Sequence, residues 1–310
     1  MNALTRLLKK SKPLWVAYTS IGGFFMKCLS IISPTLASKK MFKNSFGYKL
    51  DLKNPKTLNE KLMYLKLKEY WKNDLVTICA DKYLVREFVR KNECSEILND
   101  IYGVWDSAKD IDWESLPNKF VLKCNHGSGF NIVCTDKQAL DKKKTISLLN
   151  KWMHKKYGVE FVEHGVYSKI KRKIIAEKYI ETKNGLPPAD YKFFCSYGEV
   201  SFLFVATDRY DDKTKFDYYW PDWNYIPVKN YFENNGPVEK PKELEKMIRL
   251  AEKLSKQFPL VRVDFYAENS KIIFGELTFT HFGCLNRFEP NEYDLIFGNC
   301  FPLFDKGIRN

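Results

Sequence analysis

The run VRVDFYAENSKIIFGELTFTHFG, residues 261–283, constrains the fold more than any other part of the chain. It reads as two short strands joined by a tight turn. In the first strand Arg262, Asp264 and Tyr266 alternate with apolar residues, and a period of two puts polar side chains on one face and apolar ones on the other. The second strand alternates in the same way. The run therefore predicts an antiparallel hairpin with one polar face.

The hairpin also predicts a pair of carboxylates. A three-residue loop at residues 269–271 would place Asp264 directly opposite Glu276 and Arg262 opposite Thr278, with paired Cβ atoms about 5 Å apart. A two-residue loop would break that pairing. Like charges in such positions are destabilising, and a hard divalent cation with oxygen ligands would offset their repulsion. The alternative is a surface hairpin with two solvated acids.

A glycine-containing loop lies in PNKFVLKCNHGSGFNIVCT, residues 117–135. The segment reads as strand, loop, strand, with Lys123 ending the first strand and Gly127, Ser128 and Gly129 forming the turn. Backbone N–H groups of such a loop can cradle phosphate oxygens, and a lysine can pair with them. An ordinary hairpin turn uses glycine equally well. The segment is neither a Walker loop nor a dinucleotide fingerprint, because no GxxxxGK or GxGxxG stands here.

Further β-rich segments follow this loop. RKIIAEKYIET, residues 172–182, puts an apolar strand ahead of Glu177 and Lys178, which could equally form an exposed charge pair. Residues 188–210 give two β-rich runs that turn at Gly198. These segments predict an antiparallel meander.

The order of the motifs resembles the ATP-grasp superfamily. The matching segments are DKYLVREFV (81–89), FVLKCNHGSG (120–129), IIAEKYIE (174–181), DYKFF (190–194), RVDFY (262–266) and FGELTFTHFG (274–283). More narrowly, NPKTLNEKLMYLKL (54–67) followed by ADKYLVREFV looks like the TupA-like branch, named for teichuronopeptide biosynthesis. The resemblance covers about residues 45–300. It implies an α+β fold in which two α+β lobes grip ATP, with ATP and Mg²⁺ as the cofactors.

The resemblance implies a set of nucleotide-binding residues. Lys82 matches the first phosphate-contacting lysine and Lys123 the second, which precedes the flexible glycine loop that closes over ATP. Asp190, which follows an insertion at residues 183–188, matches the acid that meets the ribose, and Lys192 stands on the same strand. The hinge that meets the adenine through a glutamate side chain and backbone groups matches Glu177, Lys178, Tyr179 and Ile180.

The resemblance also implies the catalytic centre. Asp264 and Glu276 match the magnesium carboxylates, and Arg262 matches the arginine that holds the transferred phosphate. Typical ligases of the superfamily carry asparagine two residues after the second acid, whereas Thr278 stands here. A hydroxyl can still ligate Mg²⁺ or hold a water ligand, so Thr278 belongs to the predicted metal set. His281 sits where the family loop faces the acceptor, and it could equally be a structural histidine.

These residue types suit a ligase that activates a carboxylate by transferring the γ-phosphoryl group of ATP to it, after which an amine displaces phosphate. The protein needs cations to spread charge on the phosphoryl group, carboxylates to hold magnesium, and a lid to exclude water. We expect the carboxylate to belong to an acidic saccharide such as a uronic acid, either free or linked to a nucleotide or a lipid, and the product to enter cell-surface polysaccharide. The alternatives are a saccharide kinase, or a non-catalytic carbohydrate-binding protein that has lost ATP.

An aromatic-rich stretch, residues 208–237, is predicted to form a long irregular insertion over the mouth of the site. Aromatic faces with amide or acid groups suit carbohydrate, but such a loop could also pack on its own rings. Within it, Arg209 is the candidate for meeting an anionic acceptor group.

Composition indicates the kind of partner. The net charge of +13 suggests acidic ligands, while the absence of a helix-turn-helix, zinc or RNA-binding signature argues against nucleic acid. The eight cysteines form no CxxC pair, which suggests reduced, mostly buried thiols of a cytoplasmic protein.

We expect four regions along the chain: a basic and apolar helical segment (1–45), a helical region (46–100), an N-lobe with the glycine loop (101–180) and a C-lobe with the metal site (181–310). Lys27 interrupts the apolar stretch of residues 1–40, so neither a signal peptide nor a membrane span is favoured. A helix packed on the enzyme, or one lying peripherally on the inner membrane surface, fits better.

Four helices are predicted after this segment. A T-x-x-E capping box at Thr57 begins one from Leu58 to about Glu69. The second runs from about Leu75 to Lys91 and carries Lys82. The other two lie within residues 137–158 and 237–259.

Overall fold

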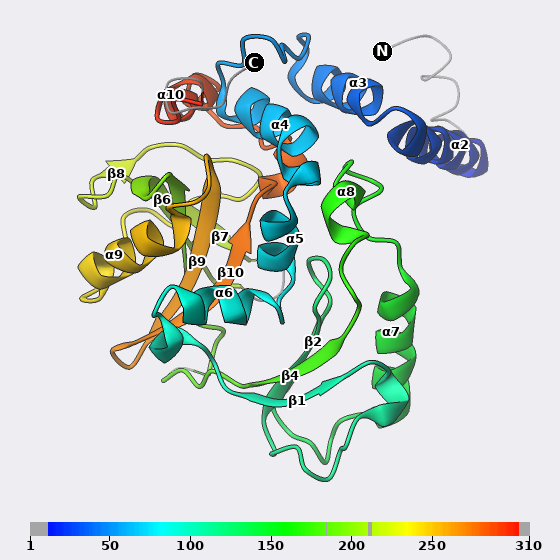
Figure 1. The fold of residues 1–310 in the computed structure, drawn as a ribbon, viewed down its shortest axis with the longest axis vertical. Coiled ribbons are helices and arrows are strands. Elements are labelled where there is room, and N and C mark those ends of the chain that lie inside the picture. Colours follow the sequence, from blue (N-terminus) through cyan, green and yellow to red (C-terminus); the bar gives the residue numbers. More distant parts are fainter. Residues whose placement is uncertain (1–11, 184, 210–212, 304–310) are drawn as a thin grey trace.

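The computed structural model describes residues 12–183, 185–209 and 213–303. Its strands form two antiparallel sheets (Figure 1). The four-stranded sheet has the order β1 (Ile101–Trp105), β4 (Ile174–Lys178), β2 (Phe120–Cys124), β3 (Asn131–Cys134). The six-stranded sheet has the order β10 (Lys271–Thr278), β9 (Val261–Glu268), β5 (Asp190–Ser196), β6 (Glu199–Thr207), β7 (Lys215–Tyr219), β8 (Tyr225–Ile226).

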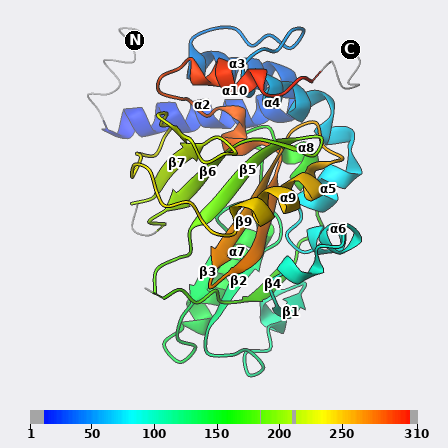
Figure 2. The ribbon, with the colours of Figure 1, turned by 90° about the vertical axis from the view of Figure 1, so that its left-hand side faces the viewer.

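Helices surround both sheets, so the predicted α+β class is confirmed. The α-helices are α2 (Lys12–Ile32), α3 (Pro34–Phe46), α4 (Leu58–Lys68), α5 (Asp74–Ala80), α6 (Val85–Lys91), α7 (Lys142–His154), α8 (His164–Tyr167), α9 (Leu244–Ser255) and α10 (Tyr293–Asn299). Helix α9 packs on β5, β6 and β9, while α7 lies against the four-stranded sheet. Helices α2, α3, α4 and α10 gather at one end of the molecule (Figures 1 and 2).

Each sheet has a hydrophobic core of its own. The larger core joins the six-stranded sheet to the helical region and α9, and includes the stacked rings of Phe194, Phe202 and Phe297. The smaller core lies between the four-stranded sheet and α7, around Phe120 and Leu149. The two cores define two lobes. Polar side chains at the edges of the lobes lie outside both cores and can form a site between the lobes.

The β9–β10 hairpin pairs its acids as predicted but with a different turn. Its loop has two residues, Asn269 and Ser270, both with positive φ (50° and 60°), so the predicted three-residue loop is wrong. Glu276 nevertheless lies opposite Asp264, because the register shifts by one residue between Phe274 and Glu276. Gly275 is the extra residue of this β-bulge. A Cβ there would lie 3.1 Å from the carbonyl oxygen of Asp264, so the bulge favours glycine.

The single helix predicted for residues 75–91 is in fact two short helices, α5 and α6. Asp81 interrupts it, since its carboxylate accepts hydrogen bonds from the backbone N–H groups of Tyr83 and Leu84. Lys82 therefore lies in the turn between the helices, where its N–H donates to the carbonyl of Asn125 in the glycine loop. The break brings Lys82 to the site. The predicted capping box of α4, by contrast, is confirmed at Thr57.

The stretch 208–237, predicted to be irregular, contributes two strands. Within its described residues, β7 and β8 extend the edge of the six-stranded sheet, and Tyr218 and Tyr219 are buried there. Tyr218 and Tyr219 pair across the sheet with β6. This pairing makes the segment a strand although its sequence alternates only weakly. The other described residues of this stretch, 208–209, 213–214, 220–224 and 227–237, lie outside the strands.

The N-terminal helices touch the body at a few points. In α2, Ser30 donates to the carbonyl of Val159, and Lys27 pairs with Glu160 at 3.0 Å. Phe24 and Phe25 remain largely exposed. Within the described part of the chain, no helix has the length and apolar character needed to cross a membrane. Residues 1–11, which belong to the predicted N-terminal segment, lie outside the described residues.

Candidate active site

A cavity of about 890 Å³ opens between the two sheets, in the size range of small-molecule sites. Its wall combines the glycine loop, Lys82, the polar residues of β5, β9 and β10, the loop that follows β10, and part of the aromatic stretch. Charged side chains dominate one part of it, which we call the ion-paired end. Its members are Lys82, Lys123, Asp190, Lys192, Arg209, Arg262, Asp264 and Glu276.

Arg262 organises this end from β9. Its guanidinium donates two 2.7 Å hydrogen bonds to the carboxylate of Asp264, one to each oxygen. The same group donates to Thr278 at 2.9 Å and lies 3.4 Å from Glu276. The alternation of β9 and the bulge in β10 explain why these four side chains meet. The sequence-predicted cluster is therefore assembled.

Two lysines complete the neutralisation of the acids. Lys82 approaches Glu276 at 3.3 Å and also donates to the carbonyl of Gly127 at 2.8 Å. Lys192, opposite Asp264 in the sheet, pairs with that acid and with Asp190. Burial alone would raise the pKa of Glu276, but Lys82, Arg262 and Lys192 hold it well below its ordinary value. Glu276 is thus a carboxylate at every physiological pH.

Lys123 and Glu177 form a separate pair across β2 and β4, with 2.6 Å between Nζ and Oε2. Burial lowers the pKa of Lys123, but Glu177, together with Tyr266 and Glu276, more than offsets this, so the lysine stays charged. The next residue, Lys178, points to the other face of the strand and pairs with Asp100 in solvent. Neither its side chain nor those of Tyr179 and Ile180 line the cavity, which leaves their backbone groups for any contact there.

The glycine loop has a fixed base and an exposed tip. Gly127 and Gly129 adopt φ values of 101° and 75°, which suit glycine. A Cβ on Gly127 would lie 2.6 Å from the ring of Tyr157, so the base admits no side chain. At the tip, Ser128 and Gly129 are exposed, and a Cβ on Gly129 would meet nothing within 4 Å. The tip can therefore approach a ligand.

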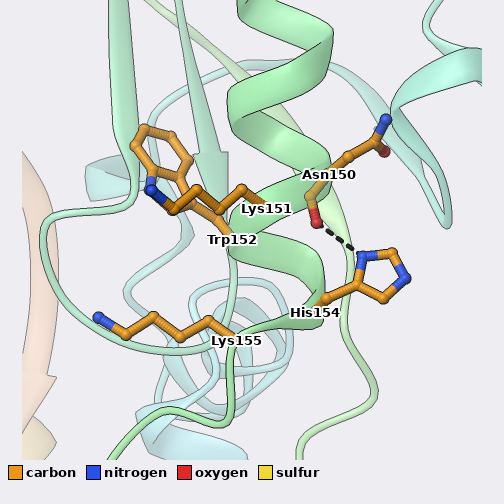
Figure 3. A pocket seen from close by; sticks show the side chains of 5 residues that line it. All are labelled: Asn150, Lys151, Trp152, His154 and Lys155. Atoms are coloured by element: carbon orange, nitrogen blue, oxygen red, sulfur yellow. Dashed lines mark hydrogen bonds between the residues drawn. The ribbon is translucent and has the colours of Figure 1, made fainter.

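The C-terminal end of α7 supports this loop. Trp152 stacks on Phe130 with 5.4 Å between ring centroids, and its carbonyl contacts the ring of His126. A separate surface hollow lies on the same turn of helix, where His154 contacts the carbonyl of Asn150 (Figure 3). That hollow contains none of the predicted site residues.

Arg209 and Asp190 lie together at the outer side of the ion-paired end. The guanidinium of Arg209 is 3.1 Å from a carboxylate oxygen of Asp190 and sits over the ring of Tyr266. Arg209 is thus adjacent to the acid predicted to meet a ribose, rather than to the loop at His281. Its predicted contact with an acceptor group remains a prediction.

The metal prediction can be judged from the donors present. Asp264, Glu276 and Thr278 supply hard oxygen atoms, which suit Mg²⁺. Among the described residues, however, no group of three or more His, Cys, Asp and Glu side chains could hold a metal ion alone. Magnesium commonly binds through one or two carboxylates together with substrate phosphates. The donor set fits an ion that shares its ligands with a bound phosphate.

His281 connects the ion-paired end to the loop after β10. Its Nδ1 accepts a hydrogen bond from Arg262, so its Nε2 carries the proton, and Nε2 has no partner. Burial, together with the charges of Arg262 and Lys192, holds the pKa of His281 well below its ordinary value. This neutral histidine positions Arg262.

The opposite part of the cavity, which we call the aromatic end, has few charges. Its rings lie close together, with 4.3 Å between the centroids of Phe216 and Phe232 and 6.1 Å between those of Phe232 and Phe282. Tyr231 is 89% exposed beside them. The aromatic end comprises Phe161, Glu163, Phe216, Tyr231, Phe232, Thr280 and Phe282.

Sequence reasoning missed the charged member of this end. Glu163 is buried, and one of its carboxylate oxygens accepts a hydrogen bond from the hydroxyl of Thr280. Burial raises the pKa of Glu163, and Lys66 and Thr280 only partly oppose the shift. Tyr157 and Tyr167 line the cavity nearby and were also missed. The segment between α7 and α8 has no periodic pattern, so the sequence offers no direct signal for them.

Comparison with known proteins gives a family and several solved structures. A family model described as TupA-like ATPgrasp matches residues 60–302. The D-alanine–D-alanine ligase from Bacillus anthracis aligns with 65% of this chain and 57% of its own, at 17% identity and a TM-score of 0.39. The L-amino acid ligase from Bacillus licheniformis aligns with 71% and 47%, at 12% identity and a TM-score of 0.40.

A third similar structure is N5-carboxyaminoimidazole synthase from Aspergillus clavatus in complex with ADP and 5-aminoimidazole ribonucleotide. It aligns with 66% of this chain and 45% of its own, at 14% identity and a TM-score of 0.42. The chain thus spans about half the length of these structures. None of the curated proteins matches the sequence.

Proposed function

Because this chain belongs to the TupA-like ATP-grasp family, we propose that it is an ATP-dependent ligase that joins a carboxylate to an amine through an acyl phosphate. The observation that carries the proposal is the ion-paired end. There the cations suited to phosphates and the carboxylates suited to magnesium lie together as ion pairs. A nucleotide with its metal ion can replace both sets of partners at once.

Each member of this end has a role in the proposed reaction. Lys82 and Lys123 contact the phosphates of ATP, and the loop at Gly127–Gly129 closes over them. Arg262, held by His281, balances the charge on the phosphoryl group as it moves to the substrate carboxylate. Lys192 and Asp190 lie at the ribose side, and Arg209 orders Asp190.

The adenine is proposed to lie against the end of β4. There Glu177 offers a side chain, and Lys178, Tyr179 and Ile180 offer backbone groups. Asp264, Glu276 and Thr278 would hold Mg²⁺, which would orient the phosphates and spread their charge.

The carboxylate substrate is proposed to be an acidic saccharide such as a uronic acid, used in cell-surface polysaccharide synthesis. The rings of Phe216, Tyr231, Phe232 and Phe282 support this, since sugar C–H faces stack on aromatic faces. The net charge of +13 favours an anionic substrate. Free and carrier-linked sugars share this chemistry.

We place the enzyme in the cytoplasm, in peripheral contact with the inner membrane surface through α2 and α3. Helix α2 exposes Phe24, Phe25 and Ile32, and α3 exposes Lys39 and Lys40. Exposed apolar and basic side chains together are typical of interfacial helices. Flotation with phosphatidylglycerol vesicles should carry the wild-type protein upward and leave Phe24→Ser/Phe25→Ser behind. Equal behaviour of the two proteins would remove this part of the proposal.

The reaction can be tested before the amine is known. Hydroxylamine is largely uncharged at neutral pH and traps acyl phosphates as coloured hydroxamates. Incubation with Mg·ATP, hydroxylamine and each of a panel of uronic acids should give ADP and hydroxamate in equal amounts. ADP without hydroxamate would indicate a saccharide kinase instead. No ADP and no ATP-dependent rise in the unfolding midpoint would favour the non-catalytic carbohydrate-binding alternative.

A further inference from the structure

Glu163 is an acid for which the reaction so far has no role. It immediately precedes α8, and its side chain forms part of the cavity wall at the aromatic end. Within the described residues its carboxylate has one hydrogen bond, from the hydroxyl of Thr280. The nearby ammonium group of Lys66 is occupied elsewhere, because it donates to the carbonyls of Phe161 and Gly283. Glu163 is therefore a buried acid with unused acceptor capacity facing a cavity.

The surroundings of Glu163 favour a cationic ligand. The titratable groups around it are Lys66, the thiol of Cys284 and the phenols of Tyr157 and Tyr167. The thiol and the phenols are neutral at physiological pH because burial raises the pKa of each. A buried carboxylate without a close counter-charge is costly, and an ion pair with good hydrogen bonds reduces that cost. An ammonium group that entered the cavity would supply the missing donors.

The position of Glu163 relative to Asp264 and Glu276 suits the transfer of an amine to the acyl phosphate. The cavity that Glu163 lines also contains Glu276, Tyr157 and Tyr167, and both acids act electrostatically on the two phenols. Tyr157 also packs against the base of the glycine loop, where a Cβ on Gly127 would lie 2.6 Å from its ring. A ligand nitrogen held by Glu163 would thus share the cavity with the phosphate site.

We propose that Glu163 binds the ammonium group of the amine substrate and removes one proton from it, an inference that rests on the proposed ligase function. The freed nitrogen lone pair attacks the carbonyl carbon of the acyl phosphate. The C–N bond forms as the C–O bond to phosphate breaks, and inorganic phosphate leaves with that electron pair. The second proton of the nitrogen leaves with the phosphate, so the step needs no further reactant.

The substrate class follows from this geometry. The amine enters as a cation and comes to the aromatic end. A neutral amide or hydroxyl group would leave the Glu163 carboxylate without a counter-charge. The proposal therefore selects primary alkylammonium compounds, amino acids and amino sugars among them, over uncharged nitrogen nucleophiles.

The test compares a charged with an uncharged amine in Glu163→Gln. With a uronic acid that supports hydroxamate formation, the variant should form hydroxamate within about 3-fold of wild type. Amide formation with alkylammonium compounds, probed with glycine, L-lysine and ethanolamine, should fall about 100-fold or more, as expected for loss of a general base. Glu160→Gln, three residues away and paired with Lys27 on the surface, should leave both reactions unchanged.

Equal losses of both reactions in Glu163→Gln would overturn the proposal and indicate that Glu163 only supports α8 and Lys66. A second measurement does not depend on knowing the carboxylate. Crystals grown with Mg·ADP and soaked in ethanolamine should place the ammonium nitrogen within hydrogen-bond distance of the Glu163 carboxylate, and the variant should lose it. Absence of that density in wild type would overturn the proposal while leaving the hydroxamate result intact.

Discussion

The two ends of the cavity satisfy their charges in different ways. At the ion-paired end, carboxylates such as Asp264 and Glu276 already have lysine or arginine partners. At the aromatic end, Glu163 has a hydroxyl for a partner and apolar rings around it. The first end is neutralised from within and must exchange partners when its ligand binds. At the second end, the positive charge that pairs with Glu163 comes from the ligand. The two ends should therefore respond differently to mutation, pH and salt.

The largest expected effect comes from Glu276→Gln, which disrupts the ion-paired end alone. Loss of a magnesium carboxylate removes several kcal/mol of phosphoryl-charge stabilisation, so turnover should fall by about 10³-fold. The circular dichroism spectrum should stay close to wild type, while the unfolding midpoint should fall, because Lys82 and Arg262 lose an acid partner. Glu268→Gln, at the turn of the same hairpin, serves as the control. Normal Mg²⁺-dependent turnover in Glu276→Gln would remove the metal assignment.

Lys123→Ala tests whether the lysine of the internal Lys123–Glu177 ion pair also contacts the nucleotide. Calorimetric titration should show ATP binding weakened by about 10- to 100-fold, since a charge-assisted hydrogen bond contributes roughly 1.5–3 kcal/mol. The midpoint should also drop, because Glu177 is left mostly buried without its partner. Adding Glu177→Gln should recover part of the stability but none of the affinity. Lys178→Ala, whose ion pair is in solvent, should behave as wild type; equal weakening there would show that only general charge matters.

A rise in pH should decrease the stabilising contribution of Glu163, at the aromatic end, and increase that of Glu276, at the ion-paired end. Burial raises the folded-state pKa of Glu163, so its stabilising contribution is present below the ordinary glutamate value and lost as the pH rises through the raised value. The pKa of Glu276 is lowered because three cations outweigh its burial. Its contribution is present above the ordinary value and lost as the pH falls toward the lowered value.

Denaturant titrations between pH 4 and pH 8 should show this contrast. The free energy of unfolding of wild type relative to Glu163→Gln should fall as the pH rises, while that relative to Glu276→Gln should rise. The same sign for both would mean that the two ends are not electrostatically distinct.

The smallest expected effect concerns the sugar-facing rings. Tyr231→Ala should raise KM for the carboxylate substrate by about 3- to 10-fold, the range expected for loss of one aromatic contact. ATP binding should be unchanged, because Tyr231 belongs to the aromatic end. Tyr102→Ala, which removes an exposed ring on β1 away from the cavity, is the matched control. An unchanged KM in Tyr231→Ala would leave the rings without a role in substrate binding.

The ion-paired end was largely predictable where its residues sit on strands. Alternation fixes the face of Arg262 and Asp264 in β9, and cross-strand pairing carries that information to Glu276 and Thr278. The turn was predicted wrongly, since the bulge at Gly275 compensates for the shorter loop. Lys82 lies at the cavity, but in a turn rather than in the predicted helix. Asp81 was the available signal, because an aspartate side chain can accept hydrogen bonds from backbone N–H groups just ahead in the chain and so favours a turn.

The aromatic end was much less predictable, for a physical reason. Glu163 and Tyr157 come from the irregular segment between α7 and α8, and Tyr167 ends the short helix α8. No local periodicity encodes their contacts. The opposite error occurred in residues 215–226, where pairing with β6 imposes strands on a sequence with weak alternation. Local pattern predicts what a strand or helix does by itself and says little about surfaces that only the assembled fold creates.

The bulge at Gly275 has a consequence for how this hairpin can change in evolution. Gly275 is opposite no residue of its own, so a gene that lost this one codon would encode a regular ladder with Asp264 still facing Glu276 and Arg262 still facing Thr278. The deletion would alter only the bend of β10 and the direction in which Glu276 points. The presence or absence of this one residue can therefore change the direction of the Glu276 side chain while Asp264 remains its cross-strand partner.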